Sequence, residues 1–154
     1  MVNIIGLNMN RIAIIFFISF ALLSCSNESV EIKNTVTAYN KILPEALAKP
    51  DEHIMEYFTS NNELSRIGAY ILLLKTQKKI MVSDLKELEF FETIVSEDRK
   101  TATLQTGEQW TFHYVDYKTR EPVTEEEAIK YENTYTMIKE KGHWVVDRID
   151  IKEN

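Results

Sequence analysis

Cysteine is nearly absent from this chain, because Cys25 is the only one among 154 residues. A disulfide within the chain is therefore excluded. Glycine and proline are also scarce, with four and three residues, whereas 44% of the residues are hydrophobic and 27% are charged. These proportions are typical of a folded globular protein and not of a disordered tail. We expect one domain of ordinary length, of about 130 residues.

Basic residues are in the minority, with 18 Lys and Arg against 24 Asp and Glu, and the net charge is -6. The acidic residues are spread along the chain, which offers no basic face to nucleic acid. His53, His113 and His143 lack the short spacings of a metal site. The sequence also has no G-x-S-x-G motif, glycine-rich phosphate loop or evident Cys and His pair. We therefore expect no metal, no cofactor, no nucleic-acid partner and no nucleophilic or nucleotide chemistry.

The chain has no apolar run long enough for a permanent membrane span. Residues 12–23 form an almost unbroken apolar run after Arg11. A helix of about 12 residues rises only ~18 Å, which is too short for a hydrocarbon core of ~30 Å. A basic residue before a short apolar run is typical of a secretion signal. We expect residues 1–24 to be a signal peptide, with Met9 as the true start because residues 1–8 place further apolar residues before the charge.

The end of this segment resembles the lipobox of bacterial lipoproteins, with Leu22, then Ser24 directly before Cys25. In that family the cysteine thiol receives a diacylglycerol, and cleavage makes the cysteine the new N-terminus. Two acyl chains anchor a protein stably, whereas one binds weakly. The resemblance implies a lipid anchor, such as palmitate, on Cys25, a tether beginning at residues 25–29, and a place in the bacterial cell envelope. Ser26 favours the outer membrane where two membranes exist, and the alternative is an ordinary thiol.

Apolar residues at spacings of three and four predict a helix over residues 30–47 with one buried face. Pro44 predicts a break or kink in it. Asp51 is a predicted N-cap of a short second helix, and Ser60 with Glu63 matches a capping box that opens a third. That third helix is apolar around much of its circumference. We therefore expect it to be the most buried of the three.

After residue 83 the apolar period changes to two, which predicts strands. The second strand, from residue 101 to 114, is long, and Gly107 either bends it or forms a bulge. A turn at residues 141–142 joins the last two strands into a hairpin. Helices followed by an antiparallel meander indicate an α+β fold. We expect N-terminal helices packed on one face of a curved, mainly antiparallel sheet of about four strands.

The aromatic patterns of these strands resemble those of the nuclear-transport-factor-like (cystatin-like) cone. They are E-x-W-x-F-x-Y at residues 108–114, Y-x-x-x-Y at 131–135 and W-V-V at 144–146. Residues 30–154 would form this cone, which is similar to the bacterial and plastid intermembrane-space (IMS) type of domain. In such cones a bent sheet wraps the helices and leaves a pocket used for catalysis, ligand binding or dimer contacts. The resemblance implies the fold without selecting a function.

Three polar residues stand at alternating strand positions that apolar residues otherwise occupy. They are Glu108, Asn133 and Asp147. If the even phase of the long strand faces inward, Glu108 lies beside Trp110 as a candidate acid or base. A bulge at Gly107 would instead turn it to solvent or to an edge. The aromatic side chains either line a pocket for an apolar ligand or fill the core. The pocket candidates are Glu108, Trp110, Tyr114, Tyr131, Asn133, Tyr135 and Asp147.

These features favour a membrane-anchored, non-catalytic binding or assembly module that contacts an envelope protein or a small apolar ligand. The alternative is an acid-base enzyme of isomerase or dehydratase type that uses Glu108 or Asp147. Related cones use a paired Asp and His for such chemistry. Here Asp116 and His113 lie on opposite faces of one predicted strand, which speaks against catalysis. The oligomeric state is not predicted.

Overall fold

The computed structural model describes the backbone of residues 9–153 and the side chains of residues 27–153. Helix α1 (Met9–Ala48), a short 3-10 helix η1 (Glu52–Met55) and helix α2 (Asn61–Thr76) precede the strands. The strands are β1 (Lys79–Val95), β2 (Thr101–Asp116), β3 (Glu127–Glu140) and β4 (His143–Glu153). They form one antiparallel sheet in the order β1-β2-β3-β4. The predicted α+β fold, with helices on a four-stranded antiparallel sheet, is confirmed.

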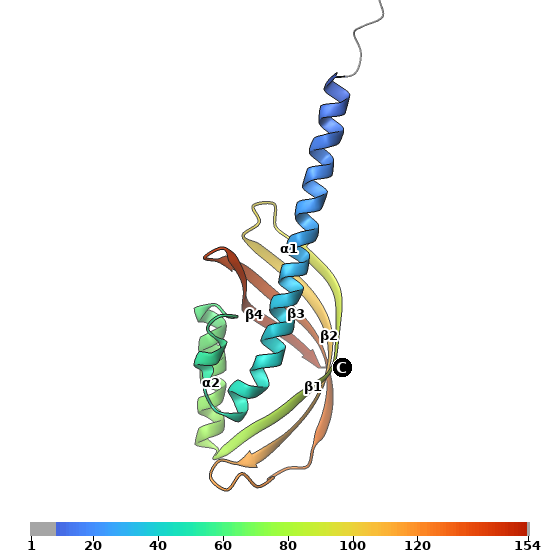
Figure 1. Ribbon diagram of the computed structural model, residues 1–154. Coiled ribbons are helices and arrows are strands. Elements are labelled where there is room, and N and C mark those ends of the chain that lie inside the picture. The colour runs from blue at the N-terminus through green and yellow to red at the C-terminus, as the bar shows by residue number, and fades with distance from the viewer. Residues whose placement is uncertain (1–8, 154) are drawn as a thin grey trace, which may run out of the picture.

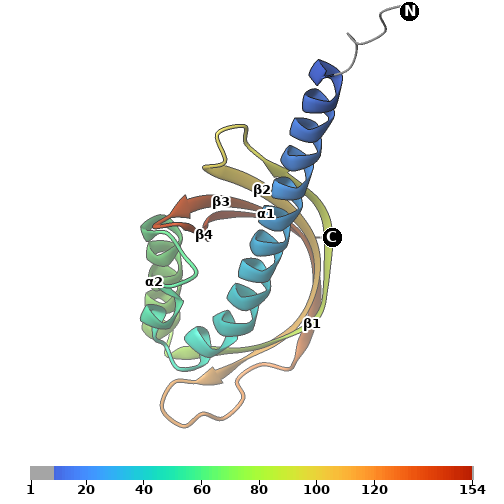
Figure 2. The same cartoon turned by 45° about the horizontal axis from the view of Figure 1, so that its top comes forward.

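The sheet curves around α1, and α2 lies on the same concave side (Figures 1 and 2). The buried face of α1 repeats at three and four residues through Ile32, Val36 and Tyr39, which are almost completely buried. These side chains pack in the core with residues of the sheet, which include Leu104, Met137, Trp144 and Val146. The core therefore lies between the concave face of the sheet and α1.

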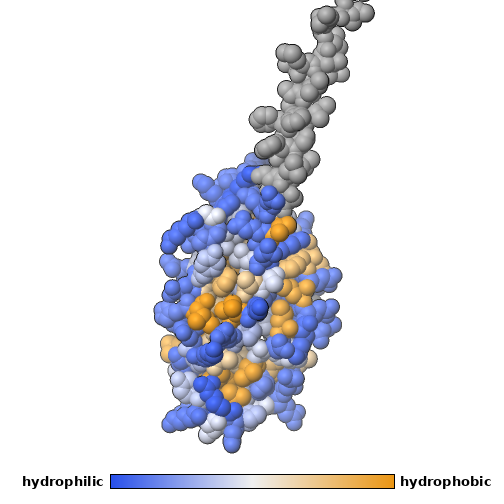
Figure 3. Space-filling view, viewed as in Figure 1, coloured by the Kyte–Doolittle hydropathy of each residue, from blue (hydrophilic) through white to orange (hydrophobic). Residues whose placement is uncertain are grey.

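Helix α2 is less buried than its sequence predicts. Ile67, Ile71 and Leu74 face the core, but Leu72 and Leu73 are 62% and 50% exposed. The prediction that this helix would be the most buried is wrong, because α1 occupies the centre of the concave face and α2 packs beside it. Hydrophobic side chains are accordingly visible on the surface over α2 and the lower end of α1 (Figure 3).

Helix α1 also differs from prediction at both of its ends. Of the two outcomes expected at Pro44, a break or a kink, the break is absent, since α1 continues to Ala48. Proline removes one backbone hydrogen bond, but burial of Ala46 and Leu47 in the last turn offsets that loss. The predicted polar tether at residues 26–29 is helical as well. The predicted start at Met9 concerns residues 1–8, which lie outside the described residues, and so does the side chain of Cys25.

The register of β2 decides which of its faces is buried. Gly107 pairs regularly with Glu89 and Glu132, and the irregularities of this ladder lie in β1. The glycine permits a close approach, because a Cβ at this position would lie 3.0 Å from Cζ of Phe91. Without a bulge in β2, the even residues keep one phase and face inward: Ala102, Leu104, Thr106, Glu108 and Trp110.

Among residues 27–153, whose side chains the structure describes, no helix combines the length and the apolar character needed to cross a bilayer.

Candidate binding cavity

A cavity of about 370 Å³ lies between the helices and the concave face of the sheet. Its size falls in the range of small-molecule sites. Leu43 and Leu47 contribute from α1, and Ile67 and Tyr70 contribute from α2. Aliphatic and aromatic side chains also dominate the strand side of the wall: Met81, Trp110, Phe112, Ile129, Tyr131, Tyr135, Ile149 and Ile151. Such a surface favours apolar molecules.

Glu108 lies at the inner wall of the cavity and is only 5% exposed. Its Oε1 accepts hydrogen bonds from the Tyr135 hydroxyl at 2.6 Å and from Thr106 Oγ1 at 2.8 Å. Asn40 Nδ2 donates to the same oxygen at 3.2 Å. The other oxygen, Oε2, accepts from Trp110 Nε1 at 2.8 Å. A carboxylate has about four acceptor positions, two on each oxygen, so three donors crowd Oε1 and Oε2 accepts one of the two bonds that it can take.

Tyr135 links this carboxylate to α1. Its hydroxyl lies 3.0 Å from Asn40 Nδ2 and 3.1 Å from Asn40 Oδ1, in addition to its contact with Glu108. Burial raises the pKa of Tyr135 well above its ordinary value, and the charge of Glu108 raises this pKa further. The phenol therefore keeps its proton and acts as a donor. Asn40, Glu108 and Tyr135 join three distant segments into one hydrogen-bonded cluster.

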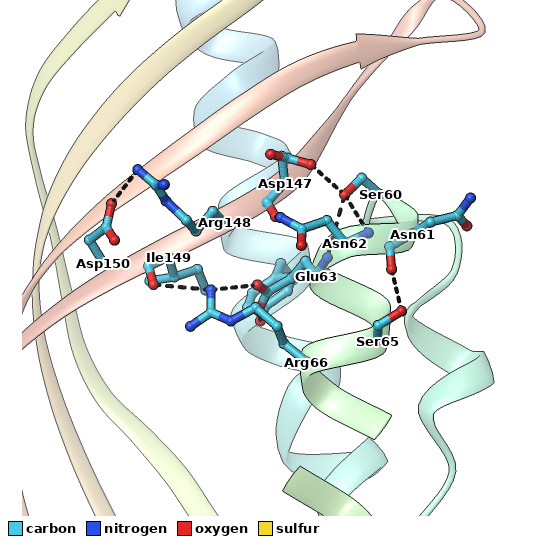
Figure 4. A network of polar contacts seen from close by, with 11 residues as sticks. Ser60, Asn61, Asn62, Glu63, Ser65, Arg66, Asp147, Arg148, Ile149 and Asp150 are labelled. Atoms are coloured by element: carbon cyan, nitrogen blue, oxygen red, sulfur yellow. Dashed lines mark hydrogen bonds and ion pairs between the residues drawn. The ribbon is translucent and has the colours of Figure 1, made fainter. Parts of the chain in front are cut away.

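A second buried carboxylate, Glu63, belongs to the first turn of α2. It accepts hydrogen bonds from the Tyr39 hydroxyl at 2.9 Å and from Arg66 Nη1 at 3.0 Å. Arg66 Nη1 also donates to the carbonyl of Ile149 at 3.2 Å, so α2 is tied to β4 (Figure 4). Burial raises the pKa of Glu63, while the hydrogen bond from Tyr39 and the charge of Arg66 lower it.

Asp147 lies outside the cavity. Its Oδ1 accepts a hydrogen bond from Ser60 Oγ at 2.7 Å, and its carbonyl accepts one from Asn62 Nδ2 at 2.9 Å (Figure 4). Ser60 Oγ in turn caps α2 by accepting from the N–H groups of Asn62 and Glu63. The second half of the predicted capping box is absent, because the Ser60 N–H donates to Val146 instead of to Glu63.

Five of the seven candidate pocket residues line the cavity: Glu108, Trp110, Tyr131, Asn133 and Tyr135. Tyr114 lies beside the wall, with its hydroxyl 3.4 Å from that of Tyr70. Asp147 does not converge with Glu108 and Asn133, because its side chain faces the start of α2. Asn133 is buried, and its Oδ1 has no hydrogen-bond partner among the described side chains and backbone.

Residues 27–153 do not contain a group of three or more potential metal ligands.

Sequence reasoning missed the helical members of these clusters, which are Tyr39, Asn40, Glu63 and Arg66. Asn40 is a polar residue on the buried face of α1, between Val36 and Leu43, and this position is the signal that points to a buried partner. Its partners Glu108 and Tyr135 are 68 and 95 residues away in sequence. Sequence spacing alone cannot pair residues at such separations.

The buried Glu63 predicts a pH dependence of stability. A raised pKa means that the folded protein holds the proton more tightly than the unfolded chain, so stability is greatest below the ordinary value near 4.5. This contribution is lost as the pH rises through the folded-state pKa. We therefore expect Glu63→Gln to gain stability relative to the wild type between about pH 4 and pH 7. Urea unfolding at several pH values measures this, and a constant difference would contradict it.

The fold and the cavity define a curved α+β cone with an apolar interior site. No protein-family model matches the chain, and no curated protein matches its sequence significantly. The intermembrane-space region of the chloroplast protein ARC6 shares the fold with a TM-score of 0.70 at 16% identity, over 80% of this chain and 95% of that one. This similarity supports the IMS-type resemblance at the level of the fold.

Two further solved structures are similar. A periplasmic fragment of TraM has a TM-score of 0.53 at 10% identity and covers 79% of this chain and 98% of its own. A calcium/calmodulin-dependent protein kinase II association domain from Xanthomonas campestris has a TM-score of 0.46 at 16% identity, over 77% of this chain and 85% of that one. The TraM fragment shares the fold of this chain, and an identity this low shows the fold alone.

Proposed function

We propose that this chain is an envelope-associated, non-catalytic binding module, anchored by lipid on Cys25, whose cavity takes a small apolar ligand or an apolar part of a partner protein. One observation carries the proposal. The cavity wall is mostly aliphatic and aromatic, and the carboxylate in this wall, Glu108, accepts four hydrogen bonds from the protein itself.

Two kinds of observation support the envelope as the location. The similar region of ARC6 lies in an intermembrane space, and the similar fragment of TraM is periplasmic. The N-terminal sequence adds a basic residue, a short apolar run and a lipobox-like end at Cys25. A lipid on Cys25 would tether the cone to a membrane on the exported side, where Ser26 favours the outer membrane.

The contacts of the two candidate acids favour binding over acid-base catalysis. A general acid or base must reach the substrate with a free hydrogen-bonding position. Four protein donors already hold Glu108, three of them on Oε1, and Asp147 accepts a hydrogen bond from the cap residue Ser60 outside the cavity. An enzyme using either residue would have to break these contacts first. The non-catalytic function therefore agrees better with the geometry.

Binding of a neutral fluorescent probe, N-phenyl-1-naphthylamine, tests the cavity. Ile129 is half-buried and lines the wall next to Trp110, its partner across the ladder. Ile129→Trp places extra volume where the probe would sit, so we expect its affinity to fall by about tenfold or more. Fluorescence titration of the full chain measures this.

Ile94→Trp is the matched control, because Ile94 lies on β1, is 55% exposed and does not line the cavity. We expect it to bind the probe like the wild type. Thermal unfolding of both variants shows whether each is folded. Absence of probe binding to the wild type, or equal binding to a folded Ile129→Trp variant, would contradict a ligand-binding cavity.

A further inference from the structure

Helix α1 is fixed to the sheet at Glu28 by a buried carboxylate. Glu28 lies 3.1 Å from Lys139 Nζ and 3.5 Å from Arg99 Nε, and its side chain is only 11% exposed. Arg99 belongs to the turn between β1 and β2, and Lys139 lies near the end of β3. One helical turn of α1 is thus held against both hairpins at the same end of the domain.

Little length separates this contact from Cys25. The backbone from Cys25 to Glu28 is part of α1, so the three residues rise only about 4.5 Å. Figure 1 shows α1 leaving the domain at the end where the β1–β2 and β3–β4 turns lie. A lipid on Cys25 would bring the turns at residues 96–100 and 141–142 close to the membrane surface, without a flexible linker between them.

The cavity lies toward the other end of the domain. The α1 residues that line it run from Tyr39 to Leu47, which are 11 to 19 residues beyond Glu28, or roughly 16 to 28 Å along the helix axis. The β2–β3 connection also marks this far end, because Arg120 Nη1 donates to the carbonyl of Ala48, the last residue of α1.

We infer that the end formed by Glu28 and the turns at residues 96–100 and 141–142 faces the bilayer surface, and that the cavity is held away from it in the aqueous space. This inference rests on the proposed lipid at Cys25. The surface of that end fits a peripheral contact, because its turns carry both acidic and basic side chains and the exposed side chains of Val30, Tyr57 and Ile94 lie nearby. A ligand would then reach the cavity from the aqueous phase, and not from within the bilayer.

Site-specific labelling tests this orientation. A lipid blocks the thiol of Cys25, the only cysteine, so an introduced cysteine becomes the only free thiol. Glu97→Cys places a fluorophore in the β1–β2 turn, and Glu121→Cys places one in the β2–β3 connection. Both glutamates are exposed. On phosphatidylethanolamine and phosphatidylglycerol vesicles with spin-labelled headgroups, we expect quenching at position 97 to exceed that at 121 several-fold.

Two further variants test the contact that fixes the helix. Glu28→Gln removes the charge that pairs with Arg99 and Lys139, so we expect it to reduce the quenching difference, whereas Glu31→Gln in the same turn should preserve it. If the protein keeps Glu28 and binds the vesicles, but labels at positions 97 and 121 are quenched equally, the orientation is wrong although the lipid anchor is present. Failure of the full chain to float with the vesicles would overturn the lipid anchor itself, and the orientation with it.

Discussion

Replacement of Glu108 by alanine is expected to lower the free energy of unfolding by about 3 to 5 kcal/mol. The substitution removes the acceptor of two buried donors, Thr106 Oγ1 and Trp110 Nε1. It also breaks the bonds that Asn40 and Tyr135 make to the carboxylate, although these two side chains keep their contact with each other. A buried donor that loses its acceptor costs its full desolvation, which exceeds the net gain of an ordinary hydrogen bond. Urea unfolding followed by tryptophan fluorescence measures the loss.

The conservative variant Glu108→Gln separates charge from hydrogen bonding. Its amide oxygen can replace Oε1, but its NH₂ group then faces the indole N–H of Trp110, so two donors meet. We expect an intermediate loss of about 1 to 3 kcal/mol. Glu89→Ala is the control, since Glu89 is an exposed residue of the neighbouring strand, and we expect its effect to stay within about 0.5 kcal/mol. A loss for Glu108→Ala as small as that of Glu89→Ala would contradict the structural role of this carboxylate.

The architecture of the sheet and the inward phase of β2 follow from local patterns. Alternation of apolar residues from Ala102 to Trp110 is enough to place Glu108 on the inner face once Gly107 is known to pair regularly. The sequence left this point open, because a glycine within a strand is compatible with a bulge as well as with a close approach. The contact of Gly107 with Phe91 on β1 decides it, and that contact lies outside any local window.

The helices show the limits of local reasoning more clearly. Pro44 disfavours helix in any short peptide, yet burial of the last turn of α1 keeps the helix intact. Asp147 occupies an apolar phase of β4, which predicted a cavity residue, but its partner Ser60 comes from a segment 87 residues earlier. Contacts between distant segments therefore determine both the end of α1 and the hydrogen-bond partner of Asp147. The sequence shows which residues are polar, but the fold determines which of them form hydrogen bonds.

Substitution of Cys25 by serine is expected to abolish incorporation of labelled palmitate and to move the protein from the membrane fraction to the soluble fraction. Each buried methylene group contributes about 0.8 kcal/mol to membrane binding, and a diacylglycerol provides two chains of them. The expected effect is therefore large.

Ser29→Ala serves as the control for this substitution, because it changes a small residue after the lipobox-like end and leaves Leu22, Ser24 and Cys25 in place. We expect it to be labelled and retained on the membrane like the wild type. Equal labelling of wild type and Cys25→Ser would show that Cys25 is not the acceptor. If the control is labelled and Cys25→Ser is not, the sulfur atom of Cys25 is the acceptor, because serine differs from it chiefly by an oxygen in place of that sulfur.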